Sequence, residues 1–157
     1  MLPITPRQSA TAAVVLLGAG VVGGAFLKLL DTPAAASLRL VGVANSRRQQ
    51  THPQRLAERR LRECLLTHGE ARDDAALLAA LQAGGGKHRV IIDATASAET
   101  ARNHPRWLAD GYHVVTANKA QAGGTLAHWQ GLRDGARAGC TRYGDAATVG
   151  AGLPVLS

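Results

Sequence analysis

The chain has 157 residues, a length that suits one domain with a single hydrophobic core. Its formal net charge is +7, but the basic residues are spread along the chain and aromatic residues make up only 3%. We therefore expect no nucleic-acid partner, which would need stacking platforms or a DNA-reading motif, and no membrane span, because no apolar run approaches about 20 residues.

Apolar runs of strand length alternate with stretches of helical periodicity along the whole chain. Continuously apolar runs of strand length are typical of central parallel strands that are buried on both faces. In the helix expected at 52–66, Pro53 stands at a plausible first helical position, with Thr51 before it as a cap. In chain order, the predicted elements are a strand at 13–17, a helix at 21–30, a strand at 38–44, helices at 52–66 and 74–83, a strand at 90–92, a helix at 99–109, a strand at 113–116, a helix at 126–138 and a weak strand beginning at 140–143.

Strands that alternate with helices predict an α/β fold, because right-handed crossovers between parallel strands put helices on both faces of the sheet. The expected architecture is a Rossmann-type, doubly wound parallel sheet in three layers.

A glycine loop, GAGVVG at 18–23, joins the first predicted strand to the first predicted helix. The G-x-G-x-x-G spacing in this context predicts a dinucleotide site. Gly18 would allow a tight turn, Gly20 the close approach of a pyrophosphate, and Gly23 close packing of the helix. The free N–H groups and the positive dipole end of the helix would meet the phosphates. The alternative is a glycine-rich turn without a ligand.

The end of the second predicted strand indicates which dinucleotide binds. An NAD enzyme usually has an Asp or Glu about 20 residues past the loop for the ribose 2′-hydroxyl. Residues 44–48, AlaAsnSerArgArg, contain no acid. Arg47 and Arg48 could hold a 2′-phosphate through charge-assisted hydrogen bonds, so NADP is the expected cofactor. NAD stays open, because Asn45 and Ser46 could bind a 2′-hydroxyl and both arginines could be merely solvated.

Polar residues also follow two later strands, at the sheet edge where open α/β sheets bind ligands. Thr95 and Ser97 come after the third predicted strand, and Thr116 and Lys119 come at the end of the fourth. Thr95 and Ser97 also suit helix capping, which does not exclude cofactor contact. A lone lysine after a strand is more often solvated, so position alone does not make Lys119 functional.

Five segments together resemble homoserine dehydrogenase: GAGVVG at 18–23, VANSRR at 43–48, IIDATAS at 91–97, GYHVVTANKA at 111–120 and ATVGAGLPV at 147–155. They follow the family's order and spacing over nearly the whole chain. The first is common to dinucleotide folds, whereas the last two are specific to this family. The resemblance implies an NAD(P)-binding domain of the oxidoreductase that converts L-aspartate 4-semialdehyde to L-homoserine, in threonine and methionine biosynthesis.

The resemblance also implies roles for single residues. Thr95, Ser97, Thr116 and Lys119 would approach the nicotinamide end, and Lys119 would be catalytic, close to the reacting carbonyl. Many relatives have a second lysine where this chain has Ala120. The complete set of predicted cofactor-binding residues is Gly18, Gly20, Val21, Val22, Gly23, Ala44, Asn45, Ser46, Arg47, Arg48, Thr95, Ser97, Thr116 and Lys119.

Many members of the family bind a monovalent cation, usually sodium, through backbone carbonyls of the last motif. The resemblance implies that Val149, Ala151 and Leu153 would supply these carbonyls here. An acidic residue normally adds a contact at the position of Ala146. Asp145 is adjacent, but it would have to shift register to take that place.

The predicted domain covers residues 13–157, and residues 1–12 are expected to form a disordered lead-in or a linker. In this family a following domain supplies the substrate pocket, a second catalytic lysine and the dimer contact. We expect that domain to be missing after Ser157, so that the chain alone binds cofactor without catalysis and the parent protein is a homo-oligomer. Some relatives carry an aspartate kinase in front, from which residues 1–12 could be a linker.

The start of the chain lacks the basic and apolar segments of a signal peptide, so we expect a cytoplasmic protein. Cys64 and Cys140 match no metal or redox spacing and are expected to be buried, reduced thiols. Two alternatives to the family assignment stay open. One is the cofactor domain of another two-domain NAD(P)-dependent oxidoreductase, and the other is a nucleotide-binding module without chemistry of its own.

Overall fold

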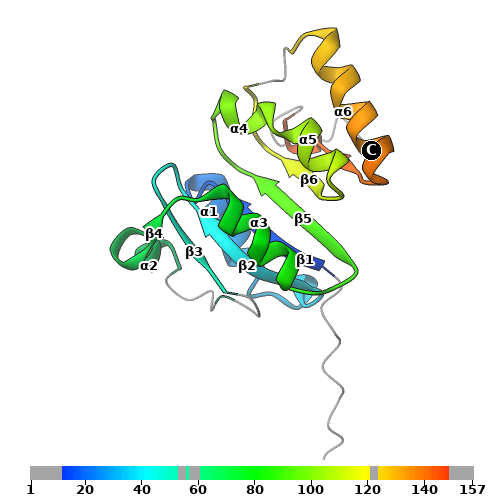
Figure 1. Cartoon of the computed structure of the whole chain (residues 1–157). Coiled ribbons are helices and arrows are strands. Elements are labelled where there is room, and N and C mark those ends of the chain that lie inside the picture. Colours follow the sequence, from blue (N-terminus) through cyan, green and yellow to red (C-terminus); the bar gives the residue numbers. More distant parts are fainter. Residues whose placement is uncertain (1–11, 53–55, 57–60, 121–123, 149–157) are drawn as a thin grey trace, which may run out of the picture.

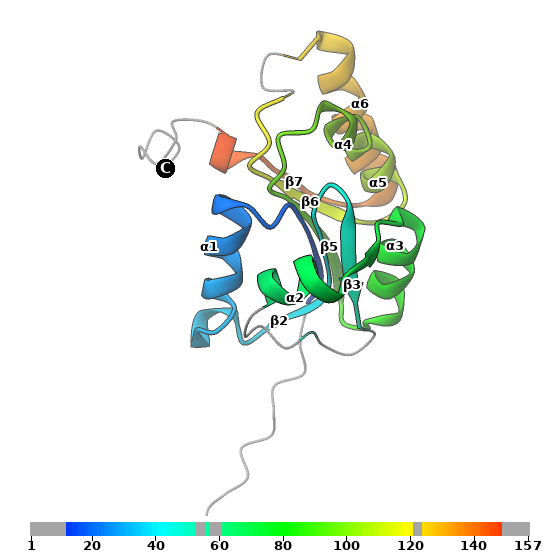
Figure 2. The ribbon, with the colours of Figure 1, turned by 90° about the vertical axis from the view of Figure 1, so that its left-hand side faces the viewer.

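The computed structural model describes residues 12–52, 56, 61–120 and 124–148, which form a seven-stranded sheet flanked by helices (Figures 1 and 2). Strands β1, β2, β5, β6 and β7 pair in parallel. This confirms the doubly wound parallel sheet for the central strands. Across the sheet the order is β4 (Glu70–Ala71), β3 (Arg48–Thr51), β2 (Leu38–Ala44), β1 (Ala12–Leu17), β5 (His88–Asp93), β6 (His113–Thr116) and β7 (Tyr143–Gly144).

Helices cover both faces of the sheet, so the three-layer architecture is confirmed. Successive side chains of β1 point to opposite faces, and all six of its residues are buried. Val14 and Leu16 pack with residues of α1 (Val21–Leu29) and α2 (Leu61–His68). Ala13, Val15 and Leu17 pack in the second core, with residues of α3 (Asp74–Ala83), α5 (His104–Ala109) and α6 (Leu126–Gly139).

The segment after β2 differs from the prediction. The expected helix at 52–66 with Thr51 as its cap is wrong at its start, because Thr51 ends β3 and the N–H of His52 donates to the Val41 carbonyl at 2.8 Å. The structure describes α2 only from Leu61, and Pro53 lies outside the described residues. The chain turns back directly after β2, so β3 and β4 join the sheet as antiparallel strands.

The predicted single helix over 99–109 is two helices, α4 (Ala98–Arg102) and α5. Pro105 explains the break, because it has no backbone N–H to continue the α4 hydrogen-bond ladder but fits the first turn of a new helix. Further on, α6 runs one residue beyond its predicted end, and the weak last strand begins at Tyr143 instead of Cys140.

The two cysteines are less buried than expected. Cys64 is half-buried and Cys140 is exposed, so the expectation of two buried thiols is wrong. Cys140 follows the end of α6 in the left-handed conformation, with φ 52°.

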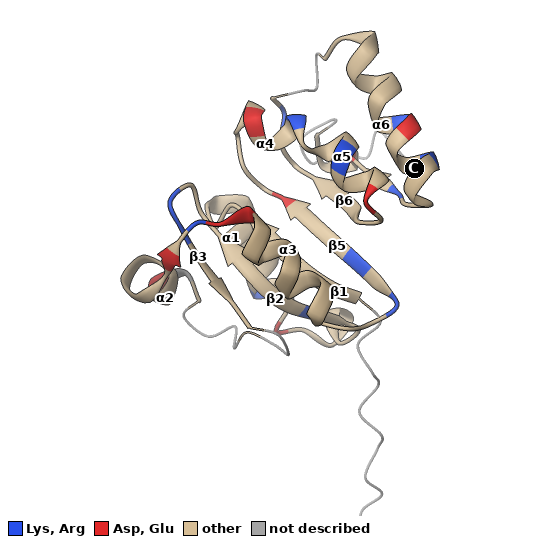
Figure 3. Cartoon of the chain, in the orientation of Figure 1, with Lys and Arg blue, Asp and Glu red and all other residues tan. Residues whose placement is uncertain are grey.

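The charged residues are spread over the molecule: Figure 3 shows Lys and Arg on several helices and strands, with Asp and Glu between them. Among the described helices, none is long and apolar enough to cross a membrane.

Candidate functional site

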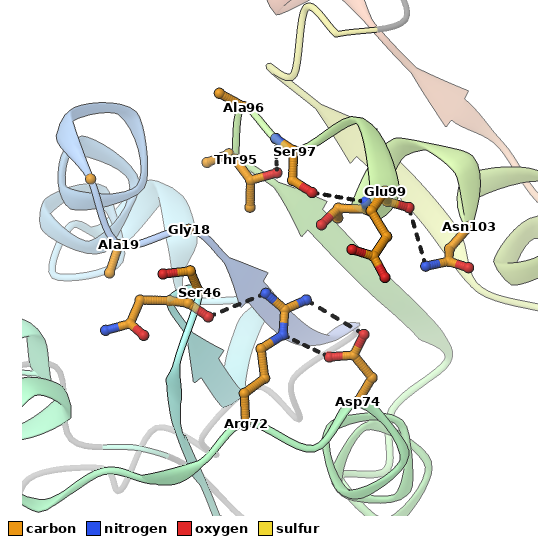
Figure 4. A pocket seen from close by; sticks show the side chains of 14 residues that line it. Gly18, Ala19, Ser46, Arg72, Asp74, Thr95, Ala96, Ser97, Glu99 and Asn103 are labelled. Atoms are coloured by element: carbon orange, nitrogen blue, oxygen red, sulfur yellow. Dashed lines mark hydrogen bonds and ion pairs between the residues drawn. The ribbon is translucent and has the colours of Figure 1, made fainter.

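A cavity of about 640 Å³ opens at the carboxyl ends of the parallel strands (Figure 4). It lies among the loop after β1, the turn after β2 and the loop after β5, where the chain's path reverses from one half of the sheet to the other. Ligands of open α/β sheets bind at such a reversal. Six of the predicted cofactor-binding residues line it: Gly18, Gly20, Asn45, Ser46, Thr95 and Ser97.

The three glycines of the loop have different surroundings. Gly18 has a φ of +93°, and a Cβ there would lie 2.6 Å from the Ala94 carbonyl oxygen. A Cβ on Gly23 would collide with the Gly18 carbonyl oxygen. By contrast, a Cβ on Gly20 would meet nothing within 4 Å. Gly18 and Gly23 are therefore required by the protein's own backbone, whereas Gly20 borders open space.

The N-terminus of α1 is the second feature that suits phosphate. Gly20 is its N-cap and supplies no side-chain hydrogen bond, and the first turn contains no acid. In α3, α4 and α6 the corresponding N–H groups are bonded by the side chains of Asp73, Ser97 and Thr125. The predicted residues Val21 and Val22 form the exposed first turn of α1, at 89% and 53% exposure. The first N–H groups of α1 and its positive dipole end thus lack a side-chain cap and suit an anion.

The turn after β2 is shaped by Asn45. Its side-chain oxygen accepts from the N–H groups of Arg47 and Arg48 at 2.8 and 2.7 Å. Ala44 is fully buried, and its carbonyl accepts from the N–H of Gly18 at 2.7 Å. The arginine side chains predicted to hold a 2′-phosphate are exposed and do not line the cavity. The guanidinium of Arg48 instead donates to the Gly69 carbonyl at 2.8 Å.

An arginine that the sequence did not single out lines the same part of the cavity. Arg72 follows β4, and its side chain is 19% exposed. Its Nη1 atom donates to the Asn45 carbonyl at 3.2 Å, and its Nε atom pairs with the Asp74 carboxylate at 2.8 Å (Figure 4). Arg72 is brought to the cavity by the β3–β4 pairing, for which the short polar strands gave no recognisable sequence signal.

The loop after β5 forms the opposite wall of the cavity. The hydroxyl of Thr95 donates to the Asp93 carboxylate at 2.7 Å. The hydroxyl of Ser97 accepts from the N–H of Thr100 at 3.1 Å and caps α4, as the capping alternative predicted. Both residues line the cavity while making these bonds.

The end of β6 is built differently. Thr116 is 1% exposed, and its hydroxyl accepts from the N–H of Asn118 at 2.9 Å. Lys119 is exposed. Neither Thr116 nor Lys119 lines the described cavity. The structure thus brings six of the predicted residues, from the first, second and third strand ends, together at one cavity, and it leaves Thr116 and Lys119 outside the cavity lining.

The cation site predicted for the carbonyls of Val149, Ala151 and Leu153 lies outside the described residues. The neighbouring Ala146 is exposed, and the Asp145 carbonyl accepts from the N–H of Thr148 at 2.8 Å.

Comparison with known proteins agrees with this site. Residues 18–143 match the family model described as "Homoserine dehydrogenase, NAD binding domain". The bifunctional aspartokinase/homoserine dehydrogenase 1, chloroplastic, of Arabidopsis thaliana is 34% identical over 94% of this chain and 17% of its own length. The homoserine dehydrogenase of Saccharomyces cerevisiae is 31% identical over 92% of this chain and 41% of its own length. The chain thus spans less than half of the length of these relatives.

Solved structures support the fold. The homoserine dehydrogenase of Thermoplasma acidophilum superposes with a TM-score of 0.72 at 23% identity, over 91% of this chain and 45% of that protein. A hyperthermophilic archaeal homoserine dehydrogenase in complex with NADPH gives a TM-score of 0.66 at 16% identity, over 87% of this chain and 44% of that protein. The family match sets aside the alternative of an unrelated oxidoreductase's cofactor domain. This chain belongs to the family of homoserine dehydrogenase NAD-binding domains.

Proposed function

We propose that the chain binds NADP(H) as the cofactor part of a homoserine dehydrogenase, which interconverts L-aspartate 4-semialdehyde and L-homoserine. The observation that carries the proposal is the cavity over Gly20, where an uncapped helix N-terminus faces open space. The relatives named as homoserine dehydrogenases, and the archaeal complex with NADPH, support the same cofactor and reaction.

Each part of the cavity suits one part of the dinucleotide. The α1 N-terminus would bind the pyrophosphate, and the turn at Asn45 and Ser46 would receive the adenosine ribose. Thr95 and Ser97 would contact the nicotinamide half. The nicotinamide ring carries the hydride, so the residues that line the cavity bind and orient the cofactor rather than react. Lys119 remains the proposed catalytic residue, exposed beyond the end of β6, where it would approach the substrate carbonyl.

Preference for NADP over NAD rests on charge. Residues 44–48 contain no acid that would repel a 2′-phosphate, and three arginines are candidates to hold it. Arg47 and Arg48 lie on the exposed turn, whereas Arg72 lines the cavity wall. Arg72 is the stronger candidate, because it lines the cavity and its guanidinium is oriented there by the hydrogen bond to the Asn45 carbonyl.

Calorimetry with NADPH and NADH tests the proposal on the wild type, on Arg72→Ala and on the double variant Arg47→Ala/Arg48→Ala. Removal of the arginine that holds the 2′-phosphate should weaken the binding of NADPH far more than that of NADH, by on the order of 1.5–3 kcal/mol. Arg137→Ala on α6, with an ion pair at 4.0 Å, is the matched control. Equal weakening of both dinucleotides in every variant would show that the 2′-phosphate assignment is wrong.

The proposal includes a sodium ion on the carbonyls of Val149, Ala151 and Leu153 and a homo-oligomeric parent protein. The ion is supported only by the family resemblance. Measuring the melting temperature in sodium chloride against choline chloride tests it, since bound sodium would stabilise the fold.

A further inference from the structure

Asp93, at the carboxyl end of β5, joins segments that are far apart in the sequence. Its side chain is 0% exposed. The Oδ1 atom accepts from the backbone N–H of Thr95 at 2.9 Å and from the Thr95 hydroxyl at 2.7 Å. The Oδ2 atom accepts from Nε2 of His104 at 2.8 Å and from Nδ2 of Asn118 at 3.0 Å. One carboxylate thus connects the loop after β5, the start of α5 and the loop after β6.

The carboxylate is an ion at neutral pH. Burial raises the pKa of Asp93, but the hydrogen bonds from His104, Thr95 and Asn118 outweigh it and leave the pKa below the ordinary value of 3.8. An ionised carboxylate can only accept hydrogen bonds, so Nε2 of His104 carries a proton and donates it to Oδ2.

His104 is held on all sides. It is 1% exposed, and its ring centroid lies 5.7 Å from those of Trp107 and Tyr143. Its Nδ1 atom lies 3.3 Å from the Tyr143 hydroxyl. Burial, together with the charges of Asp145 and Asp93, raises the pKa of Tyr143 to about 12, so the hydroxyl keeps its proton. His104 does not line the cavity, so it acts on the cavity only through Asp93.

Asn118 connects Asp93 to the loop after β5 and to the loop after β6. Its Nδ2 atom also donates to the Ser97 carbonyl at 2.8 Å and lies 3.3 Å from the Thr95 hydroxyl. Its Oδ1 atom accepts from the N–H of Ala120 at 2.9 Å, which fixes the backbone on the far side of Lys119. The segment that carries Lys119 is therefore tied to the wall that carries Thr95 and Ser97.

A buried carboxylate held by hydrogen bonds is a weak source of stability, since well-packed apolar residues in place of such buried polar groups are often equally stable or more so. Its effect here is geometric. We propose that His104 and Asp93 are a positioning pair for the nicotinamide half of the cavity. They hold the Thr95–Ser97 wall and the Asn118–Lys119 segment in the arrangement that receives the nicotinamide and its ribose. The inference rests on the proposed function.

The test compares two ligands that share the adenosine end, NADPH and adenosine 2′,5′-bisphosphate, which lacks the nicotinamide half. The full 157-residue chain is titrated by calorimetry as wild type, His104→Leu, His104→Gln and Asp93→Asn. Leucine removes the donor to Asp93, whereas the glutamine amide can still donate. Asp93→Asn keeps the volume but removes the charge, so it decides the matter if the leucine variant does not fold. Arg106→Ala is the control, because Arg106 lies on α5 with an 83% exposed side chain and, among the described residues, is not hydrogen-bonded to His104 or Asp93.

We expect His104→Leu and Asp93→Asn to weaken the affinity for NADPH about tenfold, equivalent to about 1.4 kcal/mol, and to leave the affinity for the bisphosphate unchanged. His104→Gln and Arg106→Ala should bind both ligands about as tightly as the wild type does. Equal weakening of the two ligands, or unchanged NADPH binding in both Asp93→Asn and His104→Leu, would overturn the positioning role. A wild type that binds neither ligand would instead refute the proposed function, and the inference with it.

Discussion

Gly20 is the residue at which a substitution tests cofactor binding most directly. Its neighbours Gly18 and Gly23 are fixed by contacts with the protein's own backbone, so replacing either would disturb the fold as well as binding. Gly20 has a φ of −76°, outside the left-handed region that favours glycine, and open space where its side chain would be. A substitution there separates binding from folding.

We expect Gly20→Val to remove NADPH binding while the domain stays folded, because the β-branched side chain would fill the space of the pyrophosphate. Fluorescence titration measures the binding and circular dichroism the fold. Gly24→Val is the matched control, since a Cβ on Gly24 also meets nothing within 4 Å and Gly24 does not line the cavity. Retained affinity in a folded Gly20→Val variant would show that the loop does not hold phosphates.

Asp93 should give the protein a stability that depends on pH. Its pKa is lowered in the fold, so the folded state binds fewer protons than the unfolded state as pH falls. The stabilisation is complete above the unfolded value near 3.8 and is lost as pH falls through the folded pKa. Urea unfolding of the wild type and Asp93→Asn from pH 7 to pH 3 should therefore show a difference in unfolding free energy that narrows toward acid. A constant difference over that range would contradict the ionised state.

At the scale of elements, the antiparallel pair β3–β4 has the largest effect on the site. It brings Arg72 and, at the start of α3, Asp74 to the wall beside Ser46. The strands are short, and the residues of β3 (RQQT) are polar, so neither alternation nor an apolar run marked them. The turn at Asn45, whose side chain bonds the two following N–H groups, is the one local signal that favours a reversal there.

The Arg72–Asp74 pair predicts a gain of affinity. Asp74 both neutralises part of the Arg72 charge and opposes an incoming 2′-phosphate. Asp74→Asn should therefore raise the affinity for NADPH a few-fold, by roughly 1 kcal/mol, and leave the affinity for NADH nearly unchanged. Titration of both dinucleotides measures it, with Asp134→Asn on α6, whose side chain is 75% exposed, as the control of equal charge. If both dinucleotides gain equally, Arg72 contacts the adenine or the pyrophosphate instead.

At the scale of the whole molecule, the central sheet and the glycine loop could be predicted, since both depend on local signals. The apolar runs of β1 and β2 are buried as expected, and Gly18, Gly20, Asn45, Ser46, Thr95 and Ser97 meet at one cavity. What escaped prediction depends on contacts between distant residues. Arg72 reaches the cavity through strand pairing, and His104 meets Asp93 at the start of α5, the helix that begins anew at Pro105.

The last prediction concerns catalysis by these 157 residues alone. The chain covers 41% of the length of the yeast homoserine dehydrogenase, and its described cavity is built from strand ends that suit a dinucleotide. Catalysis also needs the substrate held against the nicotinamide, and such positioning supplies as much as roughly 7–11 kcal/mol of barrier lowering. Lys119 is exposed, and the described residues that line the cavity do not include it.

We therefore expect a polypeptide of these 157 residues to bind NADPH but not to reduce NADP with L-homoserine. The measurement is NADP reduction at saturating L-homoserine, by this polypeptide and by the intact yeast homoserine dehydrogenase as the positive control. Binding without turnover would mean that Lys119 needs groups from elsewhere to orient the substrate and manage its proton. Turnover comparable to that of the intact enzyme would mean that these residues contain a complete substrate site, and that the cavity described here is only part of it.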